Sequence, residues 1–311
     1  MRPGRHSEEY HRKEVHMIDP KRGQEGGVQM GSVKFAAFYR RFLAWLLAIM
    51  VMAAGHASAA TPSTRLIFAG SGTNLPIVRV LAQAFQKRHP GVVIEVPASI
   101  GSTGGIKAAA DGAVAIGLIS RGLKEKEKVL GLTVQNYART PMIIAVHPSV
   151  AEDNITYEEL LDIYRGKKKT WGDGRDIVVL TREPGDSSIE VMEKGIPGFR
   201  EVYAESQQAR RWTTLLRDLA MNETLAKTPN AVGVSDMGAV TVERHGIKPL
   251  KVNGIAPTVK NLQNDTYTLH KTLAFAYRKD RLLEGARLFI DFVRSREGEK
   301  ILRAKGYLPE K

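Results

Sequence analysis

Short runs of β-branched and aliphatic residues alternate along this chain with amphipathic stretches, and this alternation constrains the fold more than any other feature. Thr64–Ala69 and Val92–Val96 are the first two runs, and between them Val78, Leu81 and Phe85 recur at helical spacing. Alternation between strand and helix periods is typical of layered α/β structure. The other predicted strands are Val114–Ile119, Met142–Val146, Ile177–Thr181, Ala231–Val234 and Leu273–Tyr277.

Helix signals stand between these strands. Thr156 and Glu159 form a capping box directly before an apolar stretch, which predicts that a helix begins there. Ser187 and Glu190 form a second capping box. Apolar residues near the C-terminus recur so that one face of a helix is hydrophobic. The remaining helical predictions are Ile106–Ala110, most of 199–226, Met237–His245 and Leu283–Val293.

The length of the chain predicts about two domains, because one domain takes roughly 150 residues. The chain has 311 residues. We expect two α/β lobes, with crossings near residue 147 and between 245 and 270. On this interpretation residues 60–146 and 266–311 form the first lobe. Residues 147–265 form the second lobe and the return through a hinge.

The N-terminal segment carries the pattern of a secretory signal. An apolar run at Phe42–Gly55 follows Arg40 and Arg41 and precedes Ala57-Ser58-Ala59, a small-residue cleavage pattern. The run is too short to span a bilayer as a helix. We therefore expect a signal peptide over residues 30–59, cleaved near Ala59 by the general secretory route, and a periplasmic protein. An uncleaved anchor or a buried helix is the alternative. Residues 1–29 are expected to be a non-native or disordered extension.

Composition narrows the possible functions. The chain has 46 Lys and Arg against 33 Asp and Glu, a formal net charge of +13, so nucleic acid, an anionic membrane and small anions are all candidate partners. Export argues against nucleic acid, and the cluster Lys167–Lys169 is typical of a solvated loop. There is no cysteine, which excludes disulfides, thiolate metal sites, thiol nucleophiles and a cysteine-linked lipid anchor. The histidines lack metal-ligand spacing, so we expect no metal and no cofactor.

Three segments place Gly, Ser and Thr at predicted turns from strand to helix. They are Gly70–Asn74, Ser99–Gly105 and Arg182–Ser188. Free backbone N–H groups and the helix dipole favour an anion at such turns. Each segment alone fits an ordinary helix cap equally well. Arg182 could offer a bidentate fork to an oxyanion, or it could pair with Glu183 or Asp186 at the surface.

The chain resembles the phosphate-binding (PstS-like) family of periplasmic solute-binding proteins, which serve ABC importers. The resemblance implies an α/β, two-lobe periplasmic-binding-protein (type II) fold with a hinge and a ligand cleft between the lobes. It implies capture of a small oxyanion and no catalytic residues. The segments that carry it are AGSGTN at 69–74, GSTGGIKAAADGAVAIGLISR at 101–121, ELLDIYRGKKKTWGDG at 159–174, TREPGDSS at 181–188, NAVGVSDMGAV at 230–240 and TLAFAYRKD at 272–280.

Matching these motifs position by position implies a set of ligand-binding residues. Five come from the first lobe and four from the second: Ser71, Thr73, Asn74, Ser102 and Thr103, then Arg182, Asp186, Ser187 and Ser188.

Two segments depart from the family pattern. The third loop usually reads R-x-x-G-S-G-T, and here Asp186 and Ser187 replace the first Ser and the second Gly. Where the family has an Asp that accepts the proton of the ligand, Ser120 is followed by Arg121. One such acceptor separates hydrogen phosphate, which carries a donor, from sulfate, which lacks one. We hypothesise that Asp186 takes this role; alternatively it only caps the helix.

The sequence as a whole predicts a monomeric periplasmic binding protein that captures inorganic phosphate by hinge closure and delivers it to an inner-membrane ABC permease. A binder of sulfate, molybdate or a small carboxylate is one alternative, and a ligand-sensing receptor subunit is another. A secreted phosphatase would need a metal cluster or an activated nucleophile, and the sequence shows neither.

Overall fold

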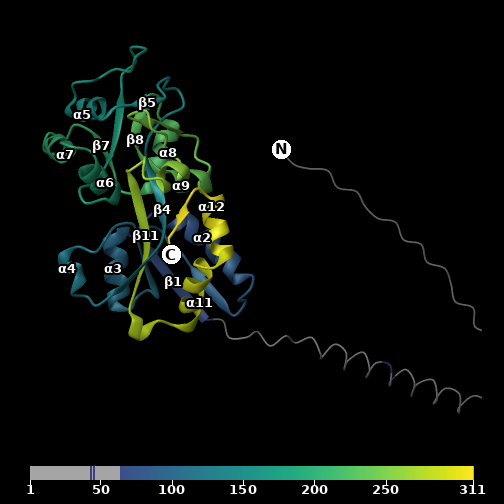
Figure 1. Ribbon diagram of the computed structural model, residues 1–311. Helices are drawn as coiled ribbons and strands as arrows, with labels where there is room; N and C mark the ends of the chain where they lie inside the picture. The colour runs from purple at the N-terminus through teal and green to yellow at the C-terminus, as the bar shows by residue number, and fades with distance from the viewer. Residues whose placement is uncertain (1–42, 44, 46–63, 311) are drawn as a thin grey trace, which may run out of the picture. The chain divides into compact units, whose positions relative to one another are not determined.

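A computed structural model describes residues 43, 45 and 64–310 of this protein (Figure 1). The expectations for residues 1–29 and for the signal peptide at 30–59 therefore lie outside the described residues, apart from the two isolated positions. None of the helices in the described part of the chain has the length and apolar character needed to cross a membrane.

The first strands and helices form one α/β unit. Strand β1 (Thr64–Gly70) pairs in parallel with β2 (Val92–Glu95) and with β3 (Ile116–Ile119). Helices α2 (Leu75–Gln86) and α3 (Gly101–Asp111) make the connections. Figure 1 shows α2 on one face of this sheet and α3 on the other. All three predicted strands are confirmed, with β3 beginning two residues later than predicted, at Ile116.

A second α/β unit follows in the middle of the chain. Strand β6 (Val178–Arg182) lies parallel to β8 (Ala231–Asp236) and to the edge strand β7 (Thr213–Leu215). The predicted capping box at Thr156 is confirmed, and α5 begins at the next residue. The helices of this unit are α5 (Tyr157–Arg165), α6 (Ser187–Gly195), α7 (Phe199–Gln208), α8 (Asp218–Lys227) and α9 (Met237–Glu243).

The prediction that residues 199–226 are mostly helical is partly wrong. Helix α7 ends at Gln208 and α8 begins at Asp218, and β7 lies between them. The β-branched Thr213 and Thr214 pair with Leu180 and Thr181 at the edge of the sheet. Tertiary pairing therefore overrides the local helical pattern at this point.

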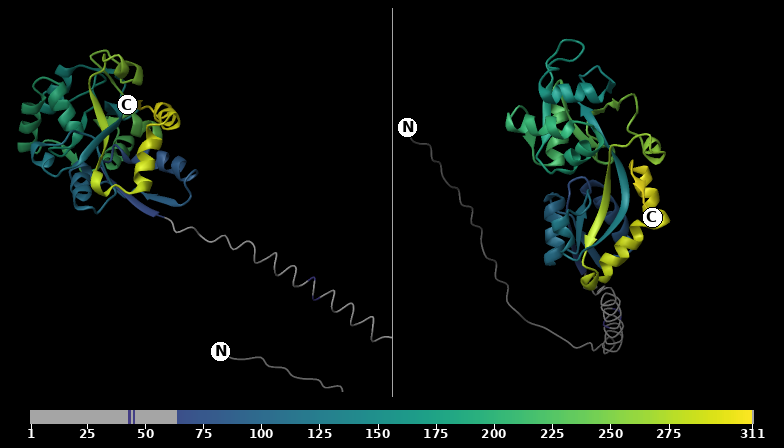
Figure 2. Two further views of the ribbon diagram at one scale, coloured as in Figure 1. Left: turned by 60° about the horizontal axis from the view of Figure 1, so that its bottom comes forward. Right: turned by 60° about the vertical axis from the view of Figure 1, so that its left-hand side comes forward.

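Two strands connect the units. The long strand β4 (Thr133–Val146) pairs with β11 (His270–Tyr277) along its first part and with β8 along its last five residues. The sheet order is therefore β2-β1-β3-β11-β4-β8-β6-β7, and Figure 2 shows β4 and β11 running from one lobe to the other. The sequence predicted only the last five residues of β4, because polar side chains and Pro141 interrupt the first part.

The hydrophobic side chains form separate cores on either side of this crossing. One core includes Phe68, Phe275 and Phe289 and extends along β4 as far as Ala138. The other begins at Met142 and consists of side chains from residues 142–269. The described residues thus form two lobes, a first lobe around the former core and a second lobe around the latter. Two α/β lobes joined by crossing strands confirm the predicted fold class.

The C-terminal elements return to the first lobe. Helix α11 (Glu284–Val293), which confirms the predicted amphipathic helix, packs on β1 and α2. Strand β12 (Leu308–Pro309) pairs with β4 at Arg139 and Ala138. The remaining short elements are α4 (Glu125–Lys128), β5 (Asn154–Ile155), β9 (Lys248–Pro249), β10 (Lys251–Val252), α10 (Val259–Gln263), a 3-10 turn at Lys279–Arg281 and α12 (Arg296–Ala304).

Candidate anion-binding site

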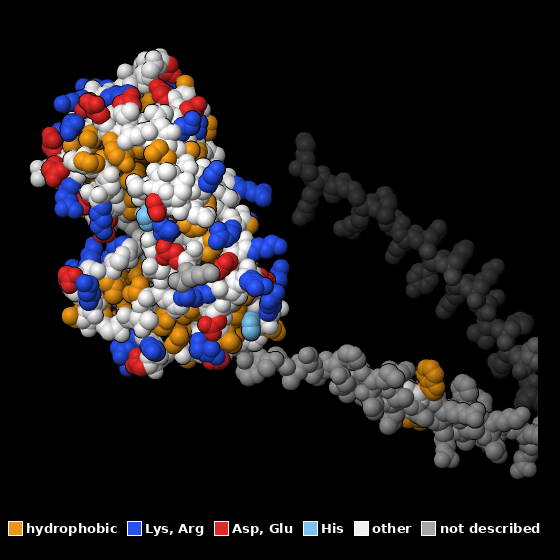
Figure 3. Space-filling model, in the orientation of Figure 1, with side chains coloured by type: hydrophobic (Ala, Val, Ile, Leu, Met, Phe, Trp, Pro, Cys, Tyr) orange, Lys and Arg blue, Asp and Glu red, His pale blue; other side chains and the backbone are white. Residues whose placement is uncertain are grey.

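A cavity of about 300 Å³ lies between the two lobes, where β1 and β6 end and the following loops turn toward helices. Figure 3 shows the surface hollowed between the lobes, with Lys and Arg side chains on both sides of the hollow. The lining combines the three segments that the sequence singled out with one further loop. The lining residues are Ser71, Gly72, Ser99–Thr103, Arg121, Arg182–Ser187 and Leu216–Asp218.

The first segment turns tightly out of β1. A side chain at Gly70 could not fit, because a Cβ there would lie 1.9 Å from the carbonyl oxygen of Leu118. The Ser71 N–H donates to the same carbonyl at 2.8 Å. The Ser71 hydroxyl shares a hydrogen bond of 2.6 Å with the Ser120 hydroxyl. This loop therefore presents Ser71 to the cavity from the first lobe.

The second segment belongs to a helix. We predicted a loop over Ser99–Gly105 with helix from Ile106, but α3 already begins at Gly101, so the prediction is wrong by about one turn. The Ser102 hydroxyl accepts from the Ser120 N–H at 3.2 Å. The Thr103 hydroxyl accepts from Arg121 Nη2 at 2.9 Å. Both residues lie in the first turn of α3, whose N-terminus faces the cavity.

The third segment is held by Asp186. The Asp186 carboxylate caps α6 by accepting from the Ser188 N–H at 2.8 Å, and its other oxygen accepts from Arg182 Nη2 at 2.9 Å. The predicted capping box of Ser187 and Glu190 is therefore wrong. Ser187 is the first residue of α6, and Glu190 instead pairs with Lys124 of the first lobe at 3.1 Å.

Arg182 is the central cation of the cavity. Its side chain is 4% exposed. Burial lowers the pKa of Arg182, but Asp218, Asp186 and Glu183 raise it above its usual value, so the guanidinium stays charged. Its Nε and Nη1 groups are buried and make no hydrogen bond to the residues that the structure describes. Buried N–H groups of this kind call for an acceptor.

Three predicted site residues do not line the cavity. Thr73, Asn74 and Ser188 are buried. The Thr73 hydroxyl accepts from Lys271 Nζ at 2.8 Å, and the Asn74 side-chain oxygen accepts from the Tyr137 hydroxyl at 2.6 Å. These side chains hold the loops in place from behind. The structure brings the other six to the cavity: Ser71, Ser102, Thr103, Arg182, Asp186 and Ser187.

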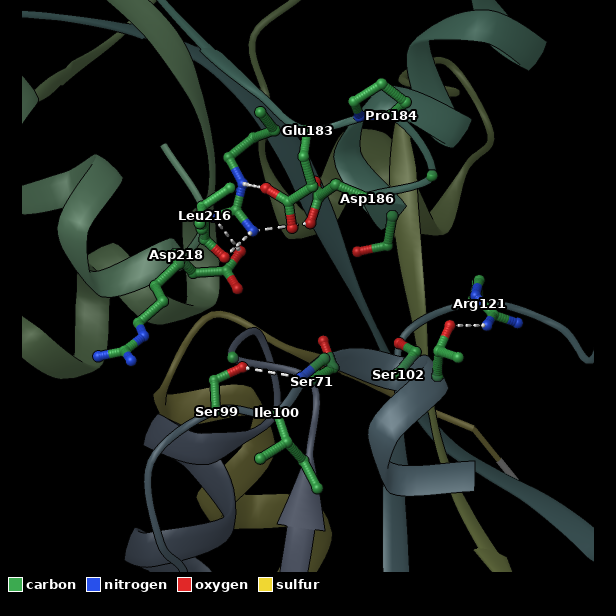
Figure 4. A pocket seen from close by; sticks show the side chains of 17 residues that line it. Ser71, Ser99, Ile100, Ser102, Arg121, Glu183, Pro184, Asp186, Leu216 and Asp218 are labelled. Atoms are coloured by element: carbon green, nitrogen blue, oxygen red, sulfur yellow. Dashed lines mark hydrogen bonds and ion pairs between the residues drawn. The ribbon is translucent and has the colours of Figure 1, made fainter. Parts of the chain in front are cut away.

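Contacts across the cleft show that the two lobes are closed on each other. The Ser120 hydroxyl donates to the Ser187 hydroxyl at 2.9 Å, so Ser120 links both lobes through side chains. Lys271 Nζ lies 3.6 Å from Asp218 Oδ1. Figure 4 shows Ser71 and Ser102 pointing toward the side of the cavity on which Asp186 and Asp218 lie.

The sequence analysis did not assign Ser120, Arg121, Asp218 or Lys271 to the site. Asp218 lies in a stretch expected to be mostly helical, and Lys271 lies two residues before the predicted strand Leu273–Tyr277. The one available signal was a charged residue close to an apolar run, as in KTLAFAY at 271–277.

Carboxylates balance most of the positive charge at the cavity. Arg121 makes two hydrogen bonds to Glu127, at 2.7 and 2.8 Å, and this pair is buried. Burial alone would raise the pKa of Asp186. Lys271, Arg182 and the hydrogen bond from Ser188 outweigh this effect and hold the pKa below its usual value, so this carboxylate is ionised. Burial raises the pKa of Glu183 above its usual value. Among the described residues, no group of three or more His, Asp or Glu side chains could hold a metal ion.

Two closed α/β lobes with a polar cavity between them define a solute-binding class of protein. Residues 56–297 match the PBP superfamily domain, and the chain belongs to that family.

Individual relatives agree with this assignment. The chain is 26% identical over 253 residues to the phosphate-binding protein PstS of Bacillus subtilis, covering 79% of this chain and 81% of that protein. Its structure resembles that of a phosphate ABC transporter substrate-binding protein with bound phosphate from Clostridium perfringens. The TM-score is 0.72 at 26% identity, and the match covers 80% of this chain and 100% of the other. The fold is also shared with an ABC-type phosphate transport receptor from Vibrio cholerae. The TM-score is 0.58 at 24% identity, and the match covers 78% of this chain and 99% of the other. The predicted resemblance is thereby confirmed.

Proposed function

We propose that this protein captures inorganic phosphate between its two lobes and delivers it to an inner-membrane ABC permease. One observation carries the proposal: two buried nitrogens of Arg182, Nε and Nη1, make no hydrogen bond to the residues described, and they lie beside a cavity lined by helix N-termini and hydroxyl groups. A phosphate oxygen pair fits the fork of a guanidinium. The names of the similar proteins from Bacillus subtilis and Clostridium perfringens support phosphate as the anion.

The ligand-binding residues proposed from the sequence divide by role. Ser71, Ser102 and Ser187 offer hydroxyl groups, and Arg182 offers charge and two donors. Asp186 fixes the Arg182 fork and the start of α6. Thr103 adds an N–H group in the first turn of α3. We propose that the side chains of Thr73, Asn74 and Ser188 act from behind, by fixing the loops that meet the anion.

Binding by hinge closure is part of the proposal. Only β4 and β11 run between the two cores among the strands described, and both cross near Thr140 and Lys271. We propose that the lobes open about these crossings, with lobe limits close to those expected at 146 and 266. Opening would separate Ser120 from Ser187 and Lys124 from Glu190, so these contacts stabilise the closed state.

We further propose that the protein binds its ligand without transforming it. The cavity lining contains no histidine or lysine among the described residues, and the Ser71 hydroxyl is hydrogen-bonded to the Ser120 hydroxyl. A serine nucleophile would need a base within hydrogen-bond reach. Among the described residues, the hydroxyls of Ser71, Ser102 and Ser187 are hydrogen-bonded to Ser120 and not to any of the carboxylates that line the cavity. A monomeric, periplasmic protein released by cleavage near Ala59 is the corresponding cellular proposal, supported by the apolar run before that site.

Calorimetric titration tests the proposed ligand directly. Phosphate, sulfate, molybdate and citrate are titrated separately into the purified protein at neutral pH. We expect one phosphate to bind per chain, with an affinity at least about 100-fold above that of the other anions, a difference of about 2.7 kcal/mol. If the protein binds sulfate, molybdate or citrate tightly and does not bind phosphate, the proposed ligand is wrong and that anion takes its place.

A further inference from the structure

Carboxylates are unusually abundant in a cavity proposed to hold an anion. Glu183, Asp186 and Asp218 all line it. Arg182 is the buried cation they surround, since the charge of Arg121 is already matched by Glu127. An ionised carboxylate repels an anion unless it accepts a proton that the anion carries. The cavity therefore discriminates by ligand protonation, and the question is which carboxylate does so.

Asp186 is poorly placed for this task. One oxygen accepts from the Ser188 N–H at the start of α6, and the other accepts from Arg182. Both oxygens already serve the protein. Glu183 has a buried oxygen, Oε2, that makes no hydrogen bond to the residues described, but this oxygen already pairs with Arg182 Nε at 3.7 Å, and the side chain as a whole is 36% exposed. Arg121 occupies the position after Ser120, where the resemblance implies an acceptor, and it can only donate.

Asp218 differs from the other two because its side chain is mostly buried and one of its oxygens lies outside both of its ion pairs. It is the first residue of α8 and its side chain is 16% exposed. A Cβ built on Gly72 would lie 2.2 Å from Asp218 Oδ2, so this oxygen lies directly against the first-lobe loop. Both of its ion pairs involve the other oxygen, Oδ1. No hydrogen-bond donor within the described residues reaches either oxygen, which leaves Oδ2 as a free acceptor. Asp218 lines the cavity, and Figure 4 shows it near Leu216 on the second-lobe side.

Lys271 accounts for the orientation of Asp218. Its side chain is completely buried on β11, at the crossing between the lobes. The ammonium group donates to the Thr73 hydroxyl at 2.8 Å and lies 3.6 Å from Asp218 Oδ1. One lysine therefore ties the first-lobe loop to the second-lobe carboxylate when the cleft is closed. By holding Oδ1, it directs Oδ2 toward the loop.

We propose that Asp218 determines specificity by accepting the acidic proton of the bound oxyanion, and that Lys271 positions Asp218 for this role. This inference rests on the proposed function. Monohydrogen phosphate and arsenate carry such a proton at neutral pH, whereas sulfate and selenate carry none. A fully deprotonated anion would place an oxygen with negative charge against Oδ2, and the site rejects it for that reason.

The test compares three variants in titrations with phosphate and with sulfate. In Asp218→Asn the side chain keeps its shape but loses its charge and one acceptor oxygen. We expect phosphate affinity to fall at least about 30-fold and sulfate affinity to rise, so that the phosphate-to-sulfate ratio falls about 100-fold or more. In Glu183→Gln, the matched control, the ratio is expected to stay within about 3-fold of the original. Asp186→Asn loosens the Arg182 fork and is expected to weaken the binding of both anions alike. A ratio unchanged in Asp218→Asn, or a collapse of the ratio in Glu183→Gln or Asp186→Asn instead, overturns the inference.

Lys271→Met separates positioning from direct contact. We expect it to lower the ratio by about 10-fold. Added to Asp218→Asn, it should lower the ratio no further, because the residue it positions is already lost. Independent, additive effects would contradict the positioning role. In Asp218→Asn the buried charge of Lys271 loses its pair with Asp218. The double variant removes that charge as well, so it can replace Asp218→Asn in the titrations if the single variant does not fold.

The unmodified protein provides a further readout. Arsenate should compete with phosphate, and selenate should not, although both are tetrahedral oxyanions. Selenate binding as tightly as arsenate overturns selection by proton. A protein that binds no phosphate at all overturns the proposed function itself, whereas phosphate binding with an unchanged ratio in Asp218→Asn overturns only the role of Asp218.

Discussion

The two lobes contribute different chemistry to the same cavity. The first lobe offers hydroxyl groups, and its one cavity-lining arginine is neutralised by a buried partner, Glu127. The second lobe offers Arg182 together with three carboxylates. The comparison suggests a division of labour. The first lobe fits the shape of an oxyanion, and the second lobe sets which charge and protonation state it accepts.

Removing the second-lobe cation should have the largest effect. Arg182→Gln deletes the charge and leaves Asp186 and Asp218 without their shared partner. We expect phosphate affinity to fall about 1,000-fold, equivalent to about 4 kcal/mol. The matched control is Arg217→Gln, because Arg217 also lines the cavity but is exposed. Titration of both variants decides the point, and a similar loss in both would contradict a special role for Arg182.

The charge balance of the first lobe can be broken at Glu127. Glu127→Gln leaves the Arg121 guanidinium buried without its partner, and we expect the free energy of unfolding to fall by about 3 kcal/mol at neutral pH. The hydrogen bond from Arg121 holds the pKa of Glu127 below its usual value. Its contribution is therefore complete above the pKa of the unfolded chain and is lost as the pH falls through the lower folded pKa.

Denaturant unfolding at several pH values measures this contribution. The difference between the original protein and Glu127→Gln should shrink as the medium becomes acidic. Glu125→Gln is the control, since the Glu125 side chain is 88% exposed and its pair with Lys128 lies at the surface. A difference that stays constant down to strongly acidic pH would show that the pair is not the cause.

The close approach of the lobes depends on the absence of a side chain at Gly72. Gly72→Ala places a methyl group against Asp218 Oδ2, and we expect phosphate affinity to fall about 10- to 30-fold through hindered closure. Gly122→Ala is the control, because a Cβ there meets open space. Equal affinities in the two variants, measured by titration, would show that the lobes need not approach so closely.

The smallest effect is expected at the rim of the cleft. Glu190→Gln removes two pairs that join the lobes, a pair with Lys124 at 3.1 Å, in which the lysine is 41% exposed, and a longer pair with Arg121 Nε at 3.9 Å. Exposed pairs contribute less than about 1 kcal/mol, so phosphate affinity should fall no more than about 5-fold. Most of the loss should disappear at high salt, because salt screens the exposed charge of Lys124. A loss that persists in high salt would point to another role for Glu190.

The sequence predicted those features that depend on neighbouring residues. The strand that leads into Ser71, the alternation of elements and the position of Arg182 before a helix are all readable from local patterns. Asp218 and Lys271 are not, because their importance arises from contacts between distant segments. The bond from Lys271 to Thr73 spans 198 positions of the chain. The first part of β4 was missed for a related reason: only its pairing with β11 makes a polar segment containing Pro141 into a strand.

The sheet order has a consequence for the sequence of events in folding. The second core is built from one uninterrupted segment, residues 142–269, whereas the first lobe needs β11 between β3 and β4. A chain that emerges from its N-terminus onward has every part of the second core before it has the central strand of the first lobe. Late closure of long-range contacts is slow, so the lobe that begins first along the chain is the one that should finish folding last.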